Sequence, residues 1–281
     1  MGLLKFFHKL KIWLTRVISP SVPYVPRSKR YGTLGEIHFY RELKRLLPSV
    51  ELKRNILVKY GVESSEIDCI AIYENKVFAI EVKRWKGDII ESENVFTQIK
   101  RDRWGEKHIK YHKSPVRQLN KAISLLKKQT GTRVWINNVI YFDSERCMYA
   151  SMQSENIFVN DMERLVAHIE NCGKKSDQKS IIEFFDKCVA ADQICIKGRE
   201  NYLQGKIYDS SLPSMTNDCL ILRKDIDYID IFHNMTYDIL SVHLKDGRVY
   251  SFESENSEIR ICIEDEVQNI AISKIDRIVL G

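Results

Sequence analysis

Two short apolar segments, Glu66–Tyr73 and Val77–Lys83, constrain what this chain can fold into more than any other feature of its sequence. Apolar residues dominate both segments, which predicts two buried β-strands. The pair Glu74-Asn75 between them is typical of a turn. We therefore predict a β-hairpin within a sheet at this point of the chain.

Helices and further strands are expected around this hairpin, which gives residues 32–195 the pattern of an α/β domain. Apolar residues at helical spacing predict a helix over Leu34–Leu47, ended by Pro48. Ser114 is the predicted N-cap of a helix that begins at Pro115 and runs to about Gln129. Strands are also predicted at Asn55–Lys59 and Val134–Phe142 and helices at Asp161–Asn171 and Lys179–Asp192, whereas residues 96–113 are expected to form a loop or a frayed helix.

Beyond Gly198 the apolar residues recur with a period of two, which indicates short strands. The sequence Lys245-Asp246-Gly247-Arg248 predicts a hairpin turn, because Asp-Gly readily adopts positive φ. Residues 196–281 are thus expected to form a small antiparallel β domain, with a boundary somewhere in residues 194–217. Its predicted strands are Leu220–Leu222, Tyr228–Phe232, Ile239–Leu244, Val249–Phe252, Arg260–Ile263 and Ile275–Leu280.

Residues 1–31 are predicted to form a basic leader, in which an amphipathic helix precedes an extended linker with Pro20, Pro23 and Pro26. Such a helix can lie on an anionic membrane surface, or dock through residues 1–18 on the body of the protein or on a second subunit. We favour docking on the body or on a second subunit, because the prolines make a stiff arm. The apolar stripe consists of Leu3, Phe6, Phe7, Leu10, Trp13, Leu14 and Val17.

The composition excludes several classes of protein. Hydrophobic residues make up 44% of the 281 residues, which is enough for a sizeable core and excludes global disorder. No apolar run approaches the roughly 20 residues that span a bilayer, which argues against an integral membrane protein. The seven cysteines are odd in number, scattered and never spaced C-x-x-C. They argue against a disulfide framework or a zinc knuckle and favour a reducing, cytoplasmic compartment.

The net charge of +6 is unevenly distributed along the chain. Residues 200–281 hold eight Lys and Arg against fifteen Asp and Glu, a balance of −7, so residues 1–199 carry +13. This asymmetry indicates that the first part of the chain meets a polyanion such as nucleic acid. A solvated, lysine-rich surface is the alternative explanation.

Asp68, Glu81 and Lys83 form the group that can carry chemistry. Asp68 lies on the first strand of the predicted hairpin, and Glu81 and Lys83, two residues apart on the second, share a face. Two carboxylates can hold Mg²⁺ while leaving positions for water and a phosphate oxygen. The lysine can then orient or deprotonate the attacking water. Salt-bridged acids and lysines at strand edges give the same pattern, so it is weak by itself.

Further motifs join this group in a fixed order. Gly35-Glu36 opens the first helix, Ile67-Asp68 and Glu81-Val82-Lys83-Arg84-Trp85-Lys86-Gly87 follow on the strands, and Ser114-Pro115-Val116-Arg117-Gln118 opens the next helix. In this order the motifs resemble those of the NERD (nuclease-related) domain, within the restriction-endonuclease-like PD-(D/E)xK superfamily. The resemblance covers roughly residues 30–145 and implies a mixed sheet flanked by helices, with a Mg²⁺-dependent nuclease site at the sheet edge.

Carried over by position, the resemblance implies a role for five residues. Asp68 and Glu81 correspond to the metal ligands, and Lys83 corresponds to the catalytic lysine. Glu36 would assist a metal directly or through water. Gln118 would be the helix glutamine near the lysine and the scissile phosphate.

The chain departs from the usual family pattern in three places. The superfamily's proline before Asp68 is absent, residues 92–113 are longer and more basic than expected, and Glu74-Asn75-Lys76 replaces a short glycine turn. None of these departures removes a catalytic group.

Cations alternate with aromatic residues between Gln98 and Lys113, which suits phosphate contacts with occasional base stacking. A solvated loop is the alternative, and Trp85 is predicted to be a packing residue. The residues expected to contact nucleic acid are Lys86, Lys100, Arg101, Arg103, Lys107, Lys110, Lys113 and Arg117.

Together these features predict a cytoplasmic, Mg²⁺-dependent endonuclease that acts on DNA, with Mn²⁺ able to substitute. A role in defence against foreign DNA fits by analogy alone. One alternative is a catalytically silent nucleic-acid-binding or scaffold protein with a nuclease-like fold. Another is a membrane-associated effector whose C-terminal β module senses a partner that the sequence does not identify. A homo-oligomer is compatible with each alternative.

Overall fold

The computed structural model describes residues 30–92, 95–143, 147–149, 156–197, 202–209, 212, 221–234, 237–254, 258–263 and 266–281. The predicted leader helix and its proline linker lie outside these residues. Within the described part, no helix has both the length and the apolar character needed to cross a membrane. The described residues fall into two compact units, Arg30–Ala190 and Ala191–Gly281.

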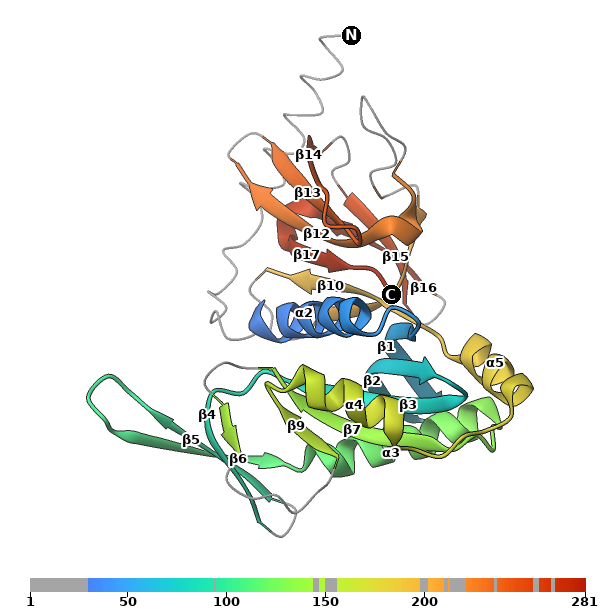
Figure 1. Ribbon diagram of the computed structural model, residues 1–281. Coiled ribbons are helices and arrows are strands. Elements are labelled where there is room, and N and C mark those ends of the chain that lie inside the picture. Colours follow the sequence, from blue (N-terminus) through green and yellow to red (C-terminus); the bar gives the residue numbers. More distant parts are fainter. Residues whose placement is uncertain are drawn as a thin grey trace, which may run out of the picture. The chain divides into compact units, whose positions relative to one another are not determined.

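A five-stranded mixed sheet forms the centre of the unit Arg30–Ala190, as the sequence predicted (Figure 1). The strand order is β1-β2-β3-β7-β9. The first three strands pair in antiparallel fashion, and β7 and β9 continue the sheet in parallel with β3. The bounds are β1 Glu51–Tyr60, β2 Glu63–Tyr73, β3 Lys76–Lys83, β7 Ile136–Phe142 and β9 Ile157–Val159.

Helices cover both faces of this sheet and give it two cores. On one face, α2 (Arg30–Leu46) and α4 (Met162–Asn171) pack on β3 and β7 around Phe39 and Phe78. On the other face, α3 (Pro115–Thr130) and α5 (Gln178–Lys187) contribute Leu126 and Phe184 to a second core. Successive residues of β3 point alternately into the two cores, which explains why that strand is almost wholly apolar.

Local sequence signals account for the predicted boundaries that the structure confirms. Glu74 and Asn75 have φ of 44° and 62°, so the turn between β2 and β3 is left-handed at both central residues. The Ser114 side chain accepts a hydrogen bond from the Arg117 N–H and caps α3, and Pro115 occupies its first turn. The predicted helix Lys179–Asp192 is wrong at its C-terminal end, because the helix ends at Lys187.

A second sheet of four strands, in the order β6-β5-β4-β8, adjoins the central sheet. Here the prediction of a loop or frayed helix over residues 96–113 is wrong, since β5 and β6 form an antiparallel hairpin that projects from the domain (Figure 1). Cations lie on both of its faces and mask the period of two. The bounds are β4 Gly87–Ser92, β5 Val95–Arg101, β6 Lys107–Lys113 and β8 Cys147–Tyr149.

The unit Ala191–Gly281 is an eight-stranded sheet in which every pairing is antiparallel, as predicted. β10 pairs with β11 and β17. This strand crosses the domain boundary between residues 195 and 196 that the sequence predicted. Leu222 precedes a 3₁₀ turn rather than ending a strand. In sheet order the strands are β14 Val249–Glu253, β13 Asp238–Leu244, β12 Ile226–His233, β17 Ile275–Val279, β10 Asp192–Ile196, β11 Tyr202–Ile207, β15 Glu258–Ile263 and β16 Glu266–Ala271.

Candidate functional site

The five residues that the resemblance singled out converge on one end of β3. Glu36 comes from α2, Asp68 from β2, Glu81 and Lys83 from β3, and Gln118 from the first turns of α3. The amide of Gln118 donates a hydrogen bond of 3.0 Å to Glu81 Oε1. The Lys83 ammonium donates to the same oxygen. One carboxylate oxygen thus holds both the lysine and the glutamine in place.

Asp68 lies where the strands β1 and β2 both change faces. Cys69 and Ala71 point into the core under α2, whereas Ile67, on the other side of Asp68, points into the core under α3. On β1 the same change occurs at Asn55, whose φ is 54°. This shared kink breaks the regular pairing of the two strands at Asn55 and Asp68.

The β2–β3 ladder also ends next to the site. Its last pair on this side is Cys69 with Ile80, and the next N–H donor along β3, Val82, donates to Asp68 Oδ2 at 2.7 Å. A side-chain carboxylate therefore takes the place of a backbone acceptor. This arrangement fixes Asp68 beside the strand that carries Glu81 and Lys83.

Burial and mutual repulsion raise the pKa values of the acids in this cluster. Burial raises the pKa of Glu36 well above its ordinary value, and the charges of Asp68 and Glu66 add to the shift. Burial likewise raises the pKa of Asp68. Burial, together with the charge of Asp68, raises the pKa of Glu81 to about 8. Ionisation of all these buried acids would place more negative charge here than the ammonium of Lys83 neutralises, which is why their pKa values rise.

Lys83 is held in its charged form by the same cluster. Burial by itself lowers the pKa of an ammonium, but the carboxylates of Glu81 and Asp68 outweigh it and raise the pKa of Lys83. Its side chain is about one fifth exposed, so the ammonium lies at the boundary between the buried acids and solvent.

The donor set fits a hard divalent cation. Glu81 is buried, and among the described residues its Oε2 has no hydrogen-bond partner. A buried carboxylate oxygen without a partner is unfavourable, and an oxygen-binding cation satisfies it. Asp68, Glu81 and Glu36 would hold such an ion. In the described chain the oxygens of these three acids are not all within 4.8 Å of one another, and Lys83 donates a hydrogen bond to Glu81 Oε1.

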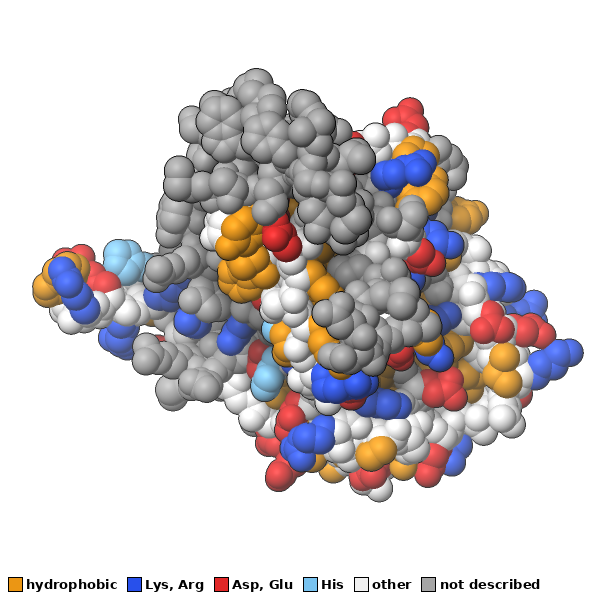
Figure 2. All heavy atoms as spheres, turned by 90° about the horizontal axis from the view of Figure 1, so that it is seen from above, with side chains coloured by type: hydrophobic (Ala, Val, Ile, Leu, Met, Phe, Trp, Pro, Cys, Tyr) orange, Lys and Arg blue, Asp and Glu red, His pale blue; other side chains and the backbone are white. Residues whose placement is uncertain are grey.

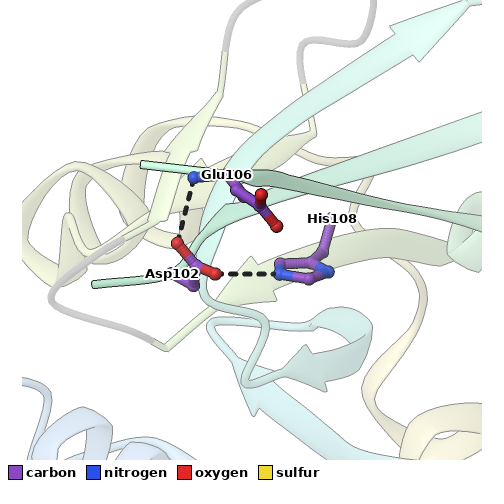
Figure 3. A group of neighbouring side chains, drawn as sticks. All are labelled: Asp102, Glu106 and His108. Atoms are coloured by element: carbon purple, nitrogen blue, oxygen red, sulfur yellow. Dashed lines mark hydrogen bonds and ion pairs between the residues drawn. The ribbon is translucent and has the colours of Figure 1, made fainter. Parts of the chain in front are cut away.

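The side chains that do meet this distance lie at the tip of the β5–β6 hairpin: Asp102, Glu106 and His108 (Figure 3). Asp102 Oδ1 accepts hydrogen bonds from the N–H groups of Trp104 and Glu106, at 2.8 and 3.0 Å. His108 Nε2 lies 3.5 Å from Asp102 Oδ2. These contacts close the hairpin turn. The sequence signal for it, an Asp three residues before Gly105, was missed.

A partly buried network that sequence reasoning also missed attaches the hairpin to the segment that follows β3. Gln98 is buried. Its amide N–H donates a hydrogen bond of 2.8 Å to the Lys86 carbonyl, and its Oε1 accepts one of 3.0 Å from His112 Nε2. The His112 ring stacks on Trp85 with centroids 4.0 Å apart. Trp85 packs against Phe96 as well, in agreement with its predicted packing role. Because Trp85 follows Lys83 by two residues, the network fixes the hairpin next to the cluster.

The model of one protein family, the nuclease-related domain (NERD), matches residues 31–143. The chain contains a NERD domain. Its limits enclose Glu36, Asp68, Glu81, Lys83 and Gln118, together with the whole β5–β6 hairpin. No curated protein and no solved structure matches the chain.

Within the NERD domain, the residues predicted to contact nucleic acid fall into two groups. Lys86 lies just beyond β3, three residues after Lys83, and Arg117 lies in the first turn of α3, next to Gln118 along the chain. The others are exposed on the hairpin and its turn. The projecting end of the hairpin carries basic, acidic, histidine and apolar side chains (Figure 2). This group consists of Lys100, Arg101, Arg103, Lys107, Lys110 and Lys113.

Proposed function

We propose that this protein is a Mg²⁺-dependent nuclease that hydrolyses phosphodiester bonds in DNA. The observation that carries the proposal is the buried carboxylate of Glu81, with one oxygen held by Lys83 and Gln118 and the other without a partner. The nuclease-related domain gives this arrangement its context. Asp68 and Glu81 would be the principal metal ligands, with Glu36 as a third acid.

A bound Mg²⁺ would polarise a phosphoryl oxygen and lower the pKa of a coordinated water. Lys83 would then donate to a phosphate oxygen and stabilise the charge that develops there. Gln118, hydrogen-bonded to Glu81, would keep that carboxylate oriented toward the ion. Lys86 and Arg117 would bind the flanking phosphates.

Cleavage of supercoiled plasmid with Mg²⁺, Mn²⁺ or EDTA tests this proposal. The unaltered protein should nick the plasmid with either metal and not with EDTA. Asp68→Asn and Lys83→Met should each lower the rate by on the order of 100-fold, because the first removes a metal ligand and the second removes the cation that stabilises the charge on the phosphate. Glu63→Gln is the matched control, since Glu63 is an exposed acid on the same strand as Asp68.

Calorimetry with Mn²⁺ separates a loss of metal binding from a loss of chemistry. Asp68→Asn should weaken Mn²⁺ binding, whereas Lys83→Met should retain it. A protein that binds DNA but neither cleaves it nor binds Mn²⁺ would instead be a silent nucleic-acid-binding protein. That result would overturn the proposal.

A further inference from the structure

We propose that the β5–β6 hairpin is a DNA-binding arm that lies in the major groove of a B-form duplex. The inference rests on the proposed function and adds to it the duplex form of the substrate and the element that recognises it. It starts from the shape of the hairpin. β4 pairs with β5 only as far as Ile99, so Lys100, Arg101, the turn and the start of β6 form a two-stranded ribbon beyond the sheet (Figure 1).

The end of this ribbon has a defined conformation. The Asp102 N–H donates to the Glu106 carbonyl at 3.0 Å, and Gly105 supplies the positive φ of the turn. The side chain of Asp102 holds the intervening N–H of Trp104. As a result Trp104 is 73% exposed, with the Arg103 guanidinium stacked 3.8 Å from its ring. Such an arm binds with little loss of conformational freedom.

The charge of the hairpin suits a polyanion. Residues 95–113 contain six Lys and Arg against Asp102 and Glu106, a balance of +4 in a chain whose net charge is +6. Lysines on β6 alone would be explained by its position at the sheet edge, where charge prevents pairing with another chain. Arg103 lies in the turn between the two strands, where that explanation does not apply.

The two faces of the hairpin differ. One face is turned to the protein at its base, where Phe96 and Gln98 are buried. On the other face, Ile109 and Tyr111 are 54% and 72% exposed. This open face pairs Ile99 with Ile109 and Thr97 with Tyr111, and the pair Arg101 with Lys107 follows toward the tip. Apolar contacts suit thymine methyl groups on the floor of a groove, and flanking cations suit the phosphates along its walls.

The shape of the groove selects the nucleic acid. The major groove of B-form DNA is about 12 Å wide and admits a two-stranded β-ribbon. The major groove of A-form RNA is too narrow and deep for side chains to read. The partly buried Gln98–His112–Trp85 network ties the base of the arm to Trp85, two residues after Lys83, so a duplex bound by the arm would lie beside the cluster that would cut it.

The arm is tested by fluorescence anisotropy in EDTA, which prevents cleavage, with the full chain. The probes are a 20-base-pair DNA duplex, its single strand and an RNA duplex of the same sequence. The arm variant is Lys100→Gln/Arg101→Gln/Lys107→Gln. Its matched control is Lys128→Gln/Arg133→Gln/Lys174→Gln, three exposed cations at the opposite end of β3 and β7.

We expect the unaltered chain to prefer duplex DNA over both other probes. The arm variant should bind the DNA duplex at least about tenfold more weakly. The slope of the logarithm of its affinity against the logarithm of the salt concentration should be smaller in magnitude by about 2 to 3, because up to three phosphate contacts are lost. The control should stay within about twofold of the unaltered chain. Ile109→Ser/Tyr111→Ser should weaken duplex binding without changing the salt dependence.

Three results would overturn the proposal that the hairpin is a DNA-binding arm. These are equal affinity for duplex RNA and duplex DNA, tighter binding of the single strand, or an arm variant that binds DNA like the control and loses only co-sedimentation with anionic vesicles. The nuclease proposal can fail separately. A chain that binds through the arm but never cleaves would contradict the nuclease alone, and a chain that cleaves with Mg²⁺ while the arm variant binds normally would contradict the arm alone.

Discussion

At the scale of single residues, Glu81 is one of three buried acids of the site whose pKa is raised. Its carboxylate is buried and repelled by Asp68, so its pKa rises from an ordinary 4.5 to about 8. Below pH 4.5 the side chain is protonated in both the folded and the unfolded state. Between pH 4.5 and about 8 only the unfolded state loses its proton, so folding takes up a proton and stability falls as pH rises.

Thermal unfolding of the metal-free protein in EDTA should therefore show a melting temperature that falls between pH 5 and pH 8. The expected fall is about 5 °C or more. Mg²⁺ should reverse it and should stabilise more at pH 8 than at pH 6, because the ion binds the ionised acids. Glu81→Gln should reduce the fall in melting temperature and weaken the effect of Mg²⁺, while Glu36 and Asp68 retain part of both. A variant whose profile matches that of the unaltered protein would contradict this assignment.

The sequence was sufficient to select Glu36, Asp68, Glu81, Lys83 and Gln118, because each stands in a short motif whose order can be read along the chain. The structure places them together. The sequence was not sufficient to select Asn55 or the network of Gln98 with His112 and Trp85. Those residues acquire their roles from partners far away along the chain, and no local pattern marks such pairings.

At the scale of elements, the kink shared by β1 and β2 presents Asp68 to the site. It depends on the left-handed backbone of Asn55, a conformation that glycine and asparagine tolerate and β-branched residues do not. Asn55→Val should destabilise the protein by about 1 to 2 kcal/mol in urea unfolding and slow plasmid cleavage. Asn55→Gly should lose less of both. A Val variant as stable and active as the unaltered protein would show that the kink does not position Asp68.

The elements that the sequence predicted well are those with a single dominant signal. The helix α3 has a capping serine and a proline, and the β2–β3 hairpin has two apolar strands around Glu74-Asn75. The β5–β6 hairpin was mistaken for a loop because cations on both faces leave little apolar alternation. Its strands are defined by the buried base, Phe96 and Gln98, and by the Asp102 turn.

At the scale of the whole molecule, the two units differ in charge. Residues 191–281 hold ten Lys and Arg against sixteen Asp and Glu, a balance of −6, so residues 1–190 carry +12. A fragment of residues 1–190 should bind DNA at least as tightly as the full chain in anisotropy measurements, because the removed part repels phosphate. A tenfold loss of affinity in the fragment would instead assign part of the DNA-binding surface to the C-terminal unit.

The unpartnered oxygen of Glu81 also bears on how the sequence persists over generations. Replacing Glu81 with a neutral side chain should make the metal-free fold more stable, and many random substitutions at this position remove the charge. A lineage released from selection for chemistry would thus lose the acid readily, with natural selection for folding favouring the loss. The chain nevertheless has Glu36, Glu66, Asp68 and Glu81 crowded at one end of β3. Such a concentration of destabilising acids is what selection for the proposed metal site would maintain.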